Sequence, residues 1–301
     1  MSPMRRLLWT FVLLLAGCMP PQSLPAVPAE VELYAPTPAG SFTPTSTTVS
    51  LDAEPVVEVT PEPSPSADFT LTPAVEPPAP PLCSPLQDTP FESLTAMISN
   101  PYHPPRPGYD DPHAGIDLAV QLPGSQVAVS GHLVQAAMAG RVAMVAVDRF
   151  PFGNALIVET PLDTLPGAWI EAAALPTPAP TLPPLSALTC PPYPALNLTG
   201  GDRRSLYTLY AHLQEAPEFS LGDPVACGQV IGAVGASGNA LNPHLHYETR
   251  AAPAGIQLAP IAHYDAGASA EEMSAYCLWS VSGMFQLVDP HKALGILAPA
   301  P

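Results

Sequence analysis

The sequence predicts a mainly β protein built around an antiparallel sheet. Short runs rich in β-branched and aromatic residues, separated by glycines and lacking helical periodicity, are typical of that class. Proline accounts for 44 of the 301 residues, and its ring removes a hydrogen-bond donor and fixes φ, so helices and central strands exclude it. We therefore expect one folded β domain, preceded by an irregular linker and interrupted by long Pro-rich loops.

Most of the expected elements lie in the second half of the chain. The strands are expected at Gln126–Val129, Gly140–Val147, Asn154–Thr160, Tyr207–His212, Gln229–Val234 and Leu245–Thr249. Short helices are expected at Glu92–Ile98 and around Ala270–Cys277. Two segments, 161–203 and 251–286, interrupt the pattern, and the first contains LPTPAPTLPP and CPPYP, which a core strand does not tolerate. We expect both to be surface insertions, because added loop length costs little entropy.

The N-terminus has the features of an export signal. Arg5 and Arg6 precede an apolar run at 7–16 that is short for a permanent membrane helix. The run leads into Leu-Ala-Gly-Cys at Cys18, which resembles the bacterial lipobox. That resemblance implies a lipoprotein signal peptide over 1–18, acylation of Cys18, and a membrane-anchored protein on the periplasmic or extracellular side, facing the cell wall. The alternatives are an ordinary signal peptide with a chance cysteine, or a short anchor helix.

Residues 19–82 are rich in Pro, Thr, Ser and Ala and show no sustained apolar period, which predicts a disordered linker. Pro-rich spacers extend by about 3.1 Å per residue, so this linker can hold the domain expected at 83–301 away from a membrane. The formal net charge of −17 argues against nucleic acid as a partner, because phosphate binding needs clustered Lys and Arg.

Four further cysteines follow the linker: Cys83, Cys190, Cys227 and Cys277. In an exported protein they are expected to form two disulfides, and four cysteines permit three pairings among which the sequence does not choose. One disulfide with two buried free thiols is the alternative. Because Cys190 and Cys277 lie in the two expected insertions, we predict disulfides that pin long loops.

Histidines and one aspartate occur at spacings that suit metal chemistry. In His113-Ala-Gly-Ile-Asp117, an even spacing in extended backbone places both side chains on one face, and Gly115 lets the backbone approach an ion. In Pro-His244-Leu-His246-Tyr-Glu, the two imidazoles likewise share a face. His212, in Tyr-Ala-His-Leu, follows a β-rich run, and alone it indicates little.

Together these elements resemble the M23 (LytM/lysostaphin-type) family of zinc endopeptidases. The blocks PHAGIDLA, AAMAGRV, LYAHL, VACGQVIGAVGASG, PHLHYE and VDP occur in the order of the family's motifs. The likeness covers most of residues 96–250 apart from the Pro-rich insertion. It implies an M23/LytM-like fold and hydrolysis of peptide bonds in the stem or cross-bridge peptides of peptidoglycan.

Carried over residue by residue, the resemblance implies one Zn²⁺ per chain, bound by His113, Asp117 and His246 with a coordination position left for water. It assigns His212 and His244 as the catalytic histidines that orient and deprotonate that water and stabilise the oxyanion. The alternative function is a catalytically silent LytM-type regulator or binding protein that activates a separate cell-wall amidase. The filled ligand positions favour the enzyme.

The remaining histidines fall outside the matched blocks, and we expect them to be structural or exposed: His103, His132, His263 and His291. Tyr109 and Asp111, just before His113, are secondary candidates for contact with substrate. The glycines between 228 and 238 lack the Lys-Ser/Thr of a phosphate-binding loop and are expected to form tight β turns.

Overall fold

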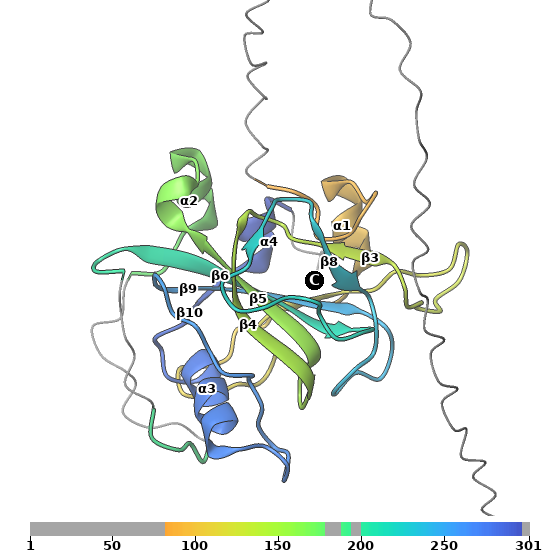
Figure 1. The fold of residues 1–301 in the computed structure, drawn as a ribbon. Helices are drawn as coiled ribbons and strands as arrows, with labels where there is room; N and C mark the ends of the chain where they lie inside the picture. The colour runs from red at the N-terminus through yellow and green to blue at the C-terminus, as the bar shows by residue number, and fades with distance from the viewer. Residues whose placement is uncertain (1–81, 178–187, 194–199, 297–301) are drawn as a thin grey trace, which may run out of the picture. The chain divides into compact units, whose positions relative to one another are not determined.

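The computed structural model describes residues 82–177, 188–193 and 200–296 (Figure 1). The predicted signal peptide with Cys18, and all but the last residue of the predicted linker, lie outside these ranges. Every described residue belongs to one compact unit, which is assigned to Thr72–Pro301. Within the ranges that the structure describes, no helix combines the length and apolar character needed to cross a bilayer.

An eight-stranded sheet forms the centre of the domain, and every strand pair in it is antiparallel. Seven strands lie in the order β1-β2-β9-β6-β5-β4-β7, and β10 also pairs with β9. Their bounds are β1 Ile98–Asn100, β2 Ile116–Leu118, β4 Gly140–Arg149, β5 Gly153–Pro161, β6 Arg204–Leu213, β7 Pro224–Val225, β9 Leu245–Pro253 and β10 Gln286–Val288. The prediction of a mainly β, antiparallel domain is confirmed.

Smaller elements surround this sheet. A two-stranded sheet joins β3 (Leu133–Gln135) to β8 (Val230–Ala233). The helices are α1 Phe91–Met97, η1 Leu162–Thr164, α2 Gly167–Ala173, α3 Ala270–Ser280 and α4 Pro290–Leu294. Helix α3 begins with a capping box, in which Ser269 and Glu272 satisfy each other's backbone N–H groups. Both helices expected from the sequence, at 92–98 and 270–277, are therefore present as α1 and α3.

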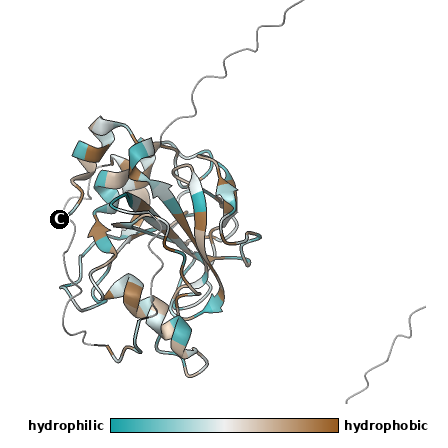
Figure 2. Ribbon diagram, turned by 60° about the vertical axis from the view of Figure 1, so that its left-hand side comes forward, coloured by the Kyte–Doolittle hydropathy of each residue, from teal (hydrophilic) through white to brown (hydrophobic). Residues whose placement is uncertain are grey.

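The two faces of the large sheet bury separate sets of apolar residues. The α1 face packs Leu94 of α1 with Ile116, Leu118, Tyr210 and Tyr247. The α3 face packs α3 against the opposite side of β4, β5 and β6; its members include Met144, Ile157, Leu209, Tyr276 and Trp279. Figure 2 shows hydrophobic residues interspersed with hydrophilic ones along the strands, as expected where successive side chains point to opposite faces.

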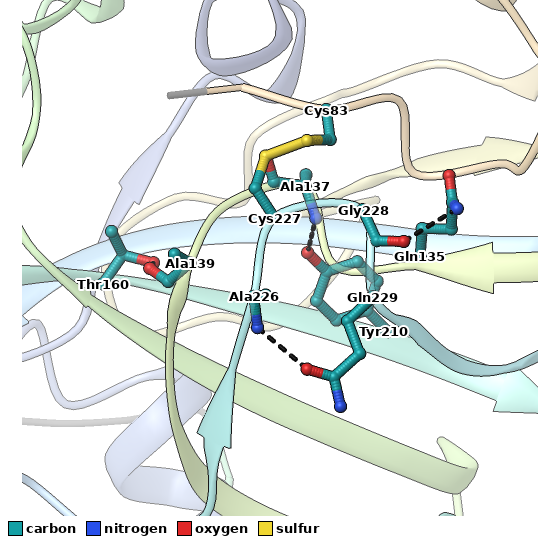
Figure 3. Close-up of a disulfide and its surroundings, with 10 residues drawn as sticks. All are labelled: Cys83, Gln135, Ala137, Ala139, Thr160, Tyr210, Ala226, Cys227, Gly228 and Gln229. Carbon is teal, nitrogen blue, oxygen red and sulfur yellow. Dashed lines mark hydrogen bonds between the residues drawn. A yellow bond between two sulfur atoms is a disulfide. The ribbon is translucent and has the colours of Figure 1, made fainter. Parts of the chain in front are cut away.

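Two disulfides are present, as the sequence predicted, and each holds one face of the sheet. On the α1 face, Cys83 is bonded to Cys227, which lies between β7 and β8 (Figure 3). On the α3 face, Cys190 is bonded to Cys277 within α3. The second bridge joins the two segments expected to be insertions, so the predicted pinning of long segments is confirmed.

Near the first disulfide, polar groups tie the small sheet to the large one. The Tyr210 hydroxyl accepts a hydrogen bond from the Ala137 backbone N–H at 2.7 Å, and Gln135 Nε2 donates to the Gly228 carbonyl at 2.8 Å (Figure 3). Tyr210 lies on β6 in the middle of the large sheet, whereas Gln135 belongs to β3. These contacts and the disulfide together fix the small sheet against the α1 face.

Two expectations from the sequence are wrong. Residues 126–129 form only an isolated bridge between Gln121 and Ala128, because Val127 is 58% exposed and has no core to face. The segment 251–286 is not a surface loop, because β9 continues to Pro253 and most of α3 is buried. In the segment 161–203, the described part includes η1 and α2, and Trp169 of α2 donates to the Ala293 carbonyl of α4 at 3.0 Å.

Candidate metal centre

The pairing of β2 with β9 places the first two site residues side by side. Asp117 is the direct cross-strand partner of His246, so both side chains leave the sheet on the same face. Their neighbours Ile116 and Leu118 point the other way, into the core of the α1 face. The site therefore lies on the α3 face, and both residues are buried, with 8% and 6% of their surface exposed.

His113, which precedes β2, completes a cluster of three donor atoms. His113 Nε2 lies 3.1 Å from Asp117 Oδ1 and 3.1 Å from His246 Nδ1, and the last two atoms are 2.9 Å apart. The sequence predicted this convergence of residues 113, 117 and 246. Among the residues that the structure describes, it is the group of three or more His, Cys, Asp or Glu side chains that could share a metal ion.

Each of these side chains is held by a second contact on its far side. His113 Nδ1 donates to the Pro101 carbonyl at 2.9 Å, Asn100 Nδ2 donates to Asp117 Oδ2 at 3.1 Å, and His246 Nε2 lies 3.2 Å from Glu248 Oε2. These contacts fix which ring nitrogen carries the proton. The atoms that face the centre, His113 Nε2 and His246 Nδ1, are therefore left with lone pairs.

Three lone pairs that converge on one point require a positive charge between them. Burial alone would lower the pKa of His246, but hydrogen bonds and charge from Asp117 and Glu248 outweigh it and raise the pKa to about 9. Burial likewise acts to raise the pKa of Asp117, yet hydrogen bonds from His113 and His246 hold it well below the usual value. A proton on His246 satisfies this cluster only in part.

A zinc ion fits the same donors. Zinc takes imidazole nitrogen and carboxylate oxygen at about 2.0–2.2 Å, so tetrahedral ligand atoms stand about 3.3 Å apart. The observed separations of 2.9–3.1 Å need to open only slightly to reach this spacing. The donor set, two imidazoles and one carboxylate with satisfied outer contacts, is therefore suited to zinc.

Gly115 is required for a reason other than the backbone freedom that the sequence suggested. A Cβ at this position would lie 2.6 Å from the Tyr247 carbonyl oxygen and 2.8 Å from Cε1 of His246. Both distances are too short for carbon, so any side chain here would displace the His246 ring. The glycine provides room for that ring.

His212 reaches the site through a β-bulge in β6. Ala211 is the direct partner of His246, so strict alternation would turn His212 to the α1 face. Opposite it, β5 pairs Leu156 with Tyr210 and Asn154 with Leu213, which leaves one β5 residue against two on β6. His212 adopts φ +60, a rare value for a residue other than glycine. The bulge keeps the ring on the α3 face, 5.9 Å from the ring of His246.

His212 and His244 form a second pair of imidazoles beside the cluster, with ring centroids 4.8 Å apart. Their Nδ1 atoms contact the carbonyls of Ser237 and Asn242, each at 2.8 Å, so each presents Nε2 to the site. His244 Nε2 lies 3.6 Å from Asp117 Oδ1. Burial, followed by the charges of His246 and His244, lowers the pKa of His212 to about 3. This ring is therefore neutral at physiological pH.

The five residues open onto a groove of about 870 Å³. Asp111 lies on the groove, in line with its expected position near a substrate, whereas Tyr109 does not contribute to the lining. Asp110, which the sequence did not single out, accepts hydrogen bonds from the hydroxyls of Tyr264 at 2.7 Å and Tyr276 at 2.6 Å. The segment that leads into His113 is thus fastened to the α3 segment.

Sequence reasoning also missed the residues that surround the cluster. Phe152 packs its ring 5.7 Å from His246 and 6.0 Å from Tyr276, and nothing in its local sequence indicates that position. Glu248 and Arg250 were detectable, because they follow His246 at spacings of two and four along one strand and must share its face.

The other described histidines lie apart from the site, as expected. His132 Nε2 contacts the Gln87 carbonyl at 2.8 Å, and His291 Nδ1 contacts Asp289 Oδ1 at 2.9 Å. His103 forms a backbone bridge with His113, and His263 packs against Tyr264. None of these four side chains joins the metal-type group found within the described ranges.

Residues 198–260 match the family model described as Peptidase family M23. The matched segment contains His212, His244 and His246, whereas His113 and Asp117 precede it. The family resemblance drawn from the sequence motifs is confirmed for this segment. No curated protein matches the chain.

Several solved structures are similar to the chain at low identity. The catalytic domain of the prophage-encoded M23 protein EnpA from Enterococcus faecalis is 22% identical, with 59% of this chain and 88% of that chain covered and a TM-score of 0.30. The catalytic domain of lysostaphin from Staphylococcus simulans is 16% identical, with 53% and 81% covered and a TM-score of 0.28. A zinc-containing peptidase from Vibrio cholerae is 22% identical, with 50% and 32% covered and a TM-score of 0.28.

Proposed function

Because the chain carries M23 peptidase sequence at residues 198–260, we propose that it is a zinc-dependent endopeptidase that hydrolyses peptide bonds in the stem or cross-bridge peptides of peptidoglycan. The observation that carries this proposal is the convergence of three lone pairs, from His113, Asp117 and His246, with two further imidazoles beside them. A purely structural role would not leave three donor atoms unpaired by protein groups at one point.

In this proposal His113 Nε2, Asp117 Oδ1 and His246 Nδ1 hold one zinc ion. When bound, zinc supplies Lewis acidity that polarises a carbonyl oxygen and lowers the pKa of water. The protein's contribution is to fix these three donors, and the contacts from Pro101 and Asn100 do so on the far side of two of them. The site is open on the side of the groove, where a substrate would enter.

His212 and His244 handle protons and the developing negative charge. Each ring has its Nδ1 engaged by a backbone carbonyl, so each presents Nε2 to a reacting group. As a neutral imidazole with its proton on Nδ1, His212 offers a lone pair that can accept a proton. His244, at the mouth of the groove, is placed to stabilise the oxyanion. Positioned acid–base groups of this kind typically contribute about 10²–10⁴ in rate.

The proposal is tested by incubating the purified full-length chain with peptidoglycan, with and without a zinc chelator, and identifying new peptide termini by mass spectrometry. We expect new termini that the chelator abolishes and that added zinc restores. His244→Ala should retain zinc, because it is not a donor, while losing most turnover. Cleavage that continues at full rate in chelator would overturn the proposal.

The alternative is a regulator that activates a separate cell-wall amidase. Under that alternative the chain releases no peptide by itself, whereas a mixture with the amidase cleaves the amide bond between glycan and stem peptide. The same mass-spectrometric assay separates the two functions, because the new termini differ. The filled donor set favours the endopeptidase.

We further propose that Cys18 carries lipid and anchors the protein to a membrane on the side that faces the cell wall. The basic start and apolar run before Cys18 support this attachment. Cys18→Ser should move the protein from the membrane fraction to the soluble fraction. Unchanged fractionation would indicate another mode of attachment.

A further inference from the structure

Strand β9 carries a line of buried polar residues beyond the metal centre. His246, Glu248 and Arg250 alternate along the strand and share the α3 face. Their exposed fractions are 6%, 1% and 3%. A buried ion pair adds little net stability over apolar residues of similar volume. The position of this pair directly behind a metal donor therefore calls for another explanation.

Contacts join the three residues into one chain. Glu248 Oε2 lies 3.2 Å from His246 Nε2, and its other oxygen, Oε1, accepts a hydrogen bond from Nε of Arg250. Both oxygens of Glu248 are thus used, one for the histidine and one for the arginine. This carboxylate cannot rotate without breaking one of the two contacts.

Arg250 is itself anchored to the α3 segment. Its Nη1 donates to the Phe285 carbonyl at 3.0 Å and to the Ser280 carbonyl at 3.4 Å. The guanidinium carbon lies 5.1 Å from the centre of the Trp279 ring, within the range of a cation–π contact. The fixed position of Arg250 is therefore set by the end of α3 and the turn that follows it.

The orientation of His246 depends on this chain. Its ring must keep the proton on Nε2 and the lone pair on Nδ1 for Nδ1 to face His113 and Asp117. We propose that Glu248 and Arg250 are positioning residues, which orient His246 and thereby set the affinity of the centre for zinc. This inference rests on the proposed zinc site but not on the proposed substrate.

The test compares two double variants of the full-length chain that carry the same net charge. Glu248→Leu with Arg250→Met removes the ion pair and leaves His246 Nε2 without an acceptor. Glu248→Gln with Arg250→Met also removes the ion pair but retains an amide oxygen for that nitrogen. Both changes avoid leaving a single buried charge, which is the case expected to disrupt folding. Zinc affinity is measured by competition with a chromophoric chelator, and folding is measured by circular dichroism.

Loss of an outer contact to a metal-binding histidine typically weakens metal affinity by about 10–100-fold. We expect a loss of that size for the Leu/Met variant, with an altered visible spectrum of the cobalt-substituted protein. The Gln/Met variant should recover part of the loss while remaining weaker than the wild type. Equal zinc affinities in the two double variants would overturn the inference. If the Leu/Met variant does not fold, a Gln/Met variant as tight as the wild type overturns it.

Arg204→Met is the matched control. Arg204 lies on the neighbouring strand β6 and also bridges the sheet to later segments, donating to the Pro176 carbonyl at 2.9 Å and to Gln286 Oε1 at 3.0 Å. It does not touch the metal centre, so its loss should leave zinc affinity unchanged. If this control weakens zinc binding as much as the double variants do, general loosening of the sheet replaces the inference.

The outcomes separate this inference from the proposed function. A wild-type protein that binds zinc but releases no peptide sinks the endopeptidase proposal and leaves the positioning role intact. A wild-type protein that cleaves peptidoglycan while both double variants bind zinc normally does the reverse. Failure of the wild type to bind zinc overturns both.

Discussion

The two faces of strand β9 differ in chemistry although they share one backbone. On the α1 face, Tyr247 joins an apolar core with Tyr210, Ile116 and Leu118. On the α3 face, His246 and the two residues at even spacing after it form a continuous polar line. The α1 face therefore supplies stability, whereas the α3 face carries the chemistry. Substitutions on adjacent residues should separate the two properties.

The largest expected effect comes from the adjacent pair Asp117 and Leu118. Asp117→Ala removes one of three donors and should weaken zinc binding by more than about 100-fold, beyond the loss typical of outer contacts. It should leave the protein folded, because the like lone pairs around it are relieved. Metal analysis after dialysis checks this, and full zinc content in the variant would contradict the assignment of the donors.

Leu118→Ala is the counterpart on the α1 face. The Leu118 side chain is fully buried, and such truncations typically cost about 2–5 kcal/mol of unfolding free energy. Zinc content of the folded protein should remain that of the wild type. Chemical denaturation measures the stability, and a loss of zinc without loss of stability would show that the two faces are not separable.

The next effect is expected at Gly115. Gly115→Ala places a Cβ against the His246 ring and the Tyr247 carbonyl, so the ring must shift. A displacement of about 1 Å in a catalytic group can lower activity by about 10²-fold. Peptidoglycan hydrolysis and zinc affinity should both fall. Gly201→Ala is a poor control because its φ is positive, whereas a Cβ on Gly167 meets no atom within 4 Å, so Gly167→Ala should leave both unchanged.

The disulfides provide a comparison of intermediate size. Replacing either cysteine pair with alanine should cost about 2–5 kcal/mol, and the loops of 144 and 87 residues should differ by only about 0.4 kcal/mol. Activity should distinguish them. Loss of Cys190–Cys277 loosens α3, whose Tyr276 packs against Phe152 beside His246. Loss of Cys83–Cys227 leaves that contact intact. Equal activities of the two folded variants would show that α3 does not support the groove.

The smallest effect is expected at Tyr210. Tyr210→Phe removes the acceptor for the Ala137 backbone N–H in a buried setting, and an unsatisfied buried donor typically costs about 1–3 kcal/mol. Zinc affinity and hydrolysis should be unchanged, because the hydroxyl lies on the α1 face. Thermal unfolding with parallel activity measurements checks both statements.

The sequence allowed prediction of the fold class, of α1 and α3, and of most long strands, because alternation and turn residues are local signals. It also placed the five site residues, because their motifs keep fixed spacings. The burial of 251–286 was not predicted, since apolar residues there face a sheet formed by distant segments. The bulge that turns His212 towards the site was equally hidden, because it depends on an unequal residue count between β5 and β6.

The bond between Cys83 and Cys227 has a mechanical consequence. Cys83 stands at the start of the described domain, and its partner follows β7, which pairs with β4 at one end of the large sheet. A pull on the chain from its N-terminal side is passed through this covalent link to the sheet before it reaches α1 or β1. The hydrogen bonds near His113 and Asp117 are thereby shielded from that force, and the pocket should keep its shape while the protein is under tension.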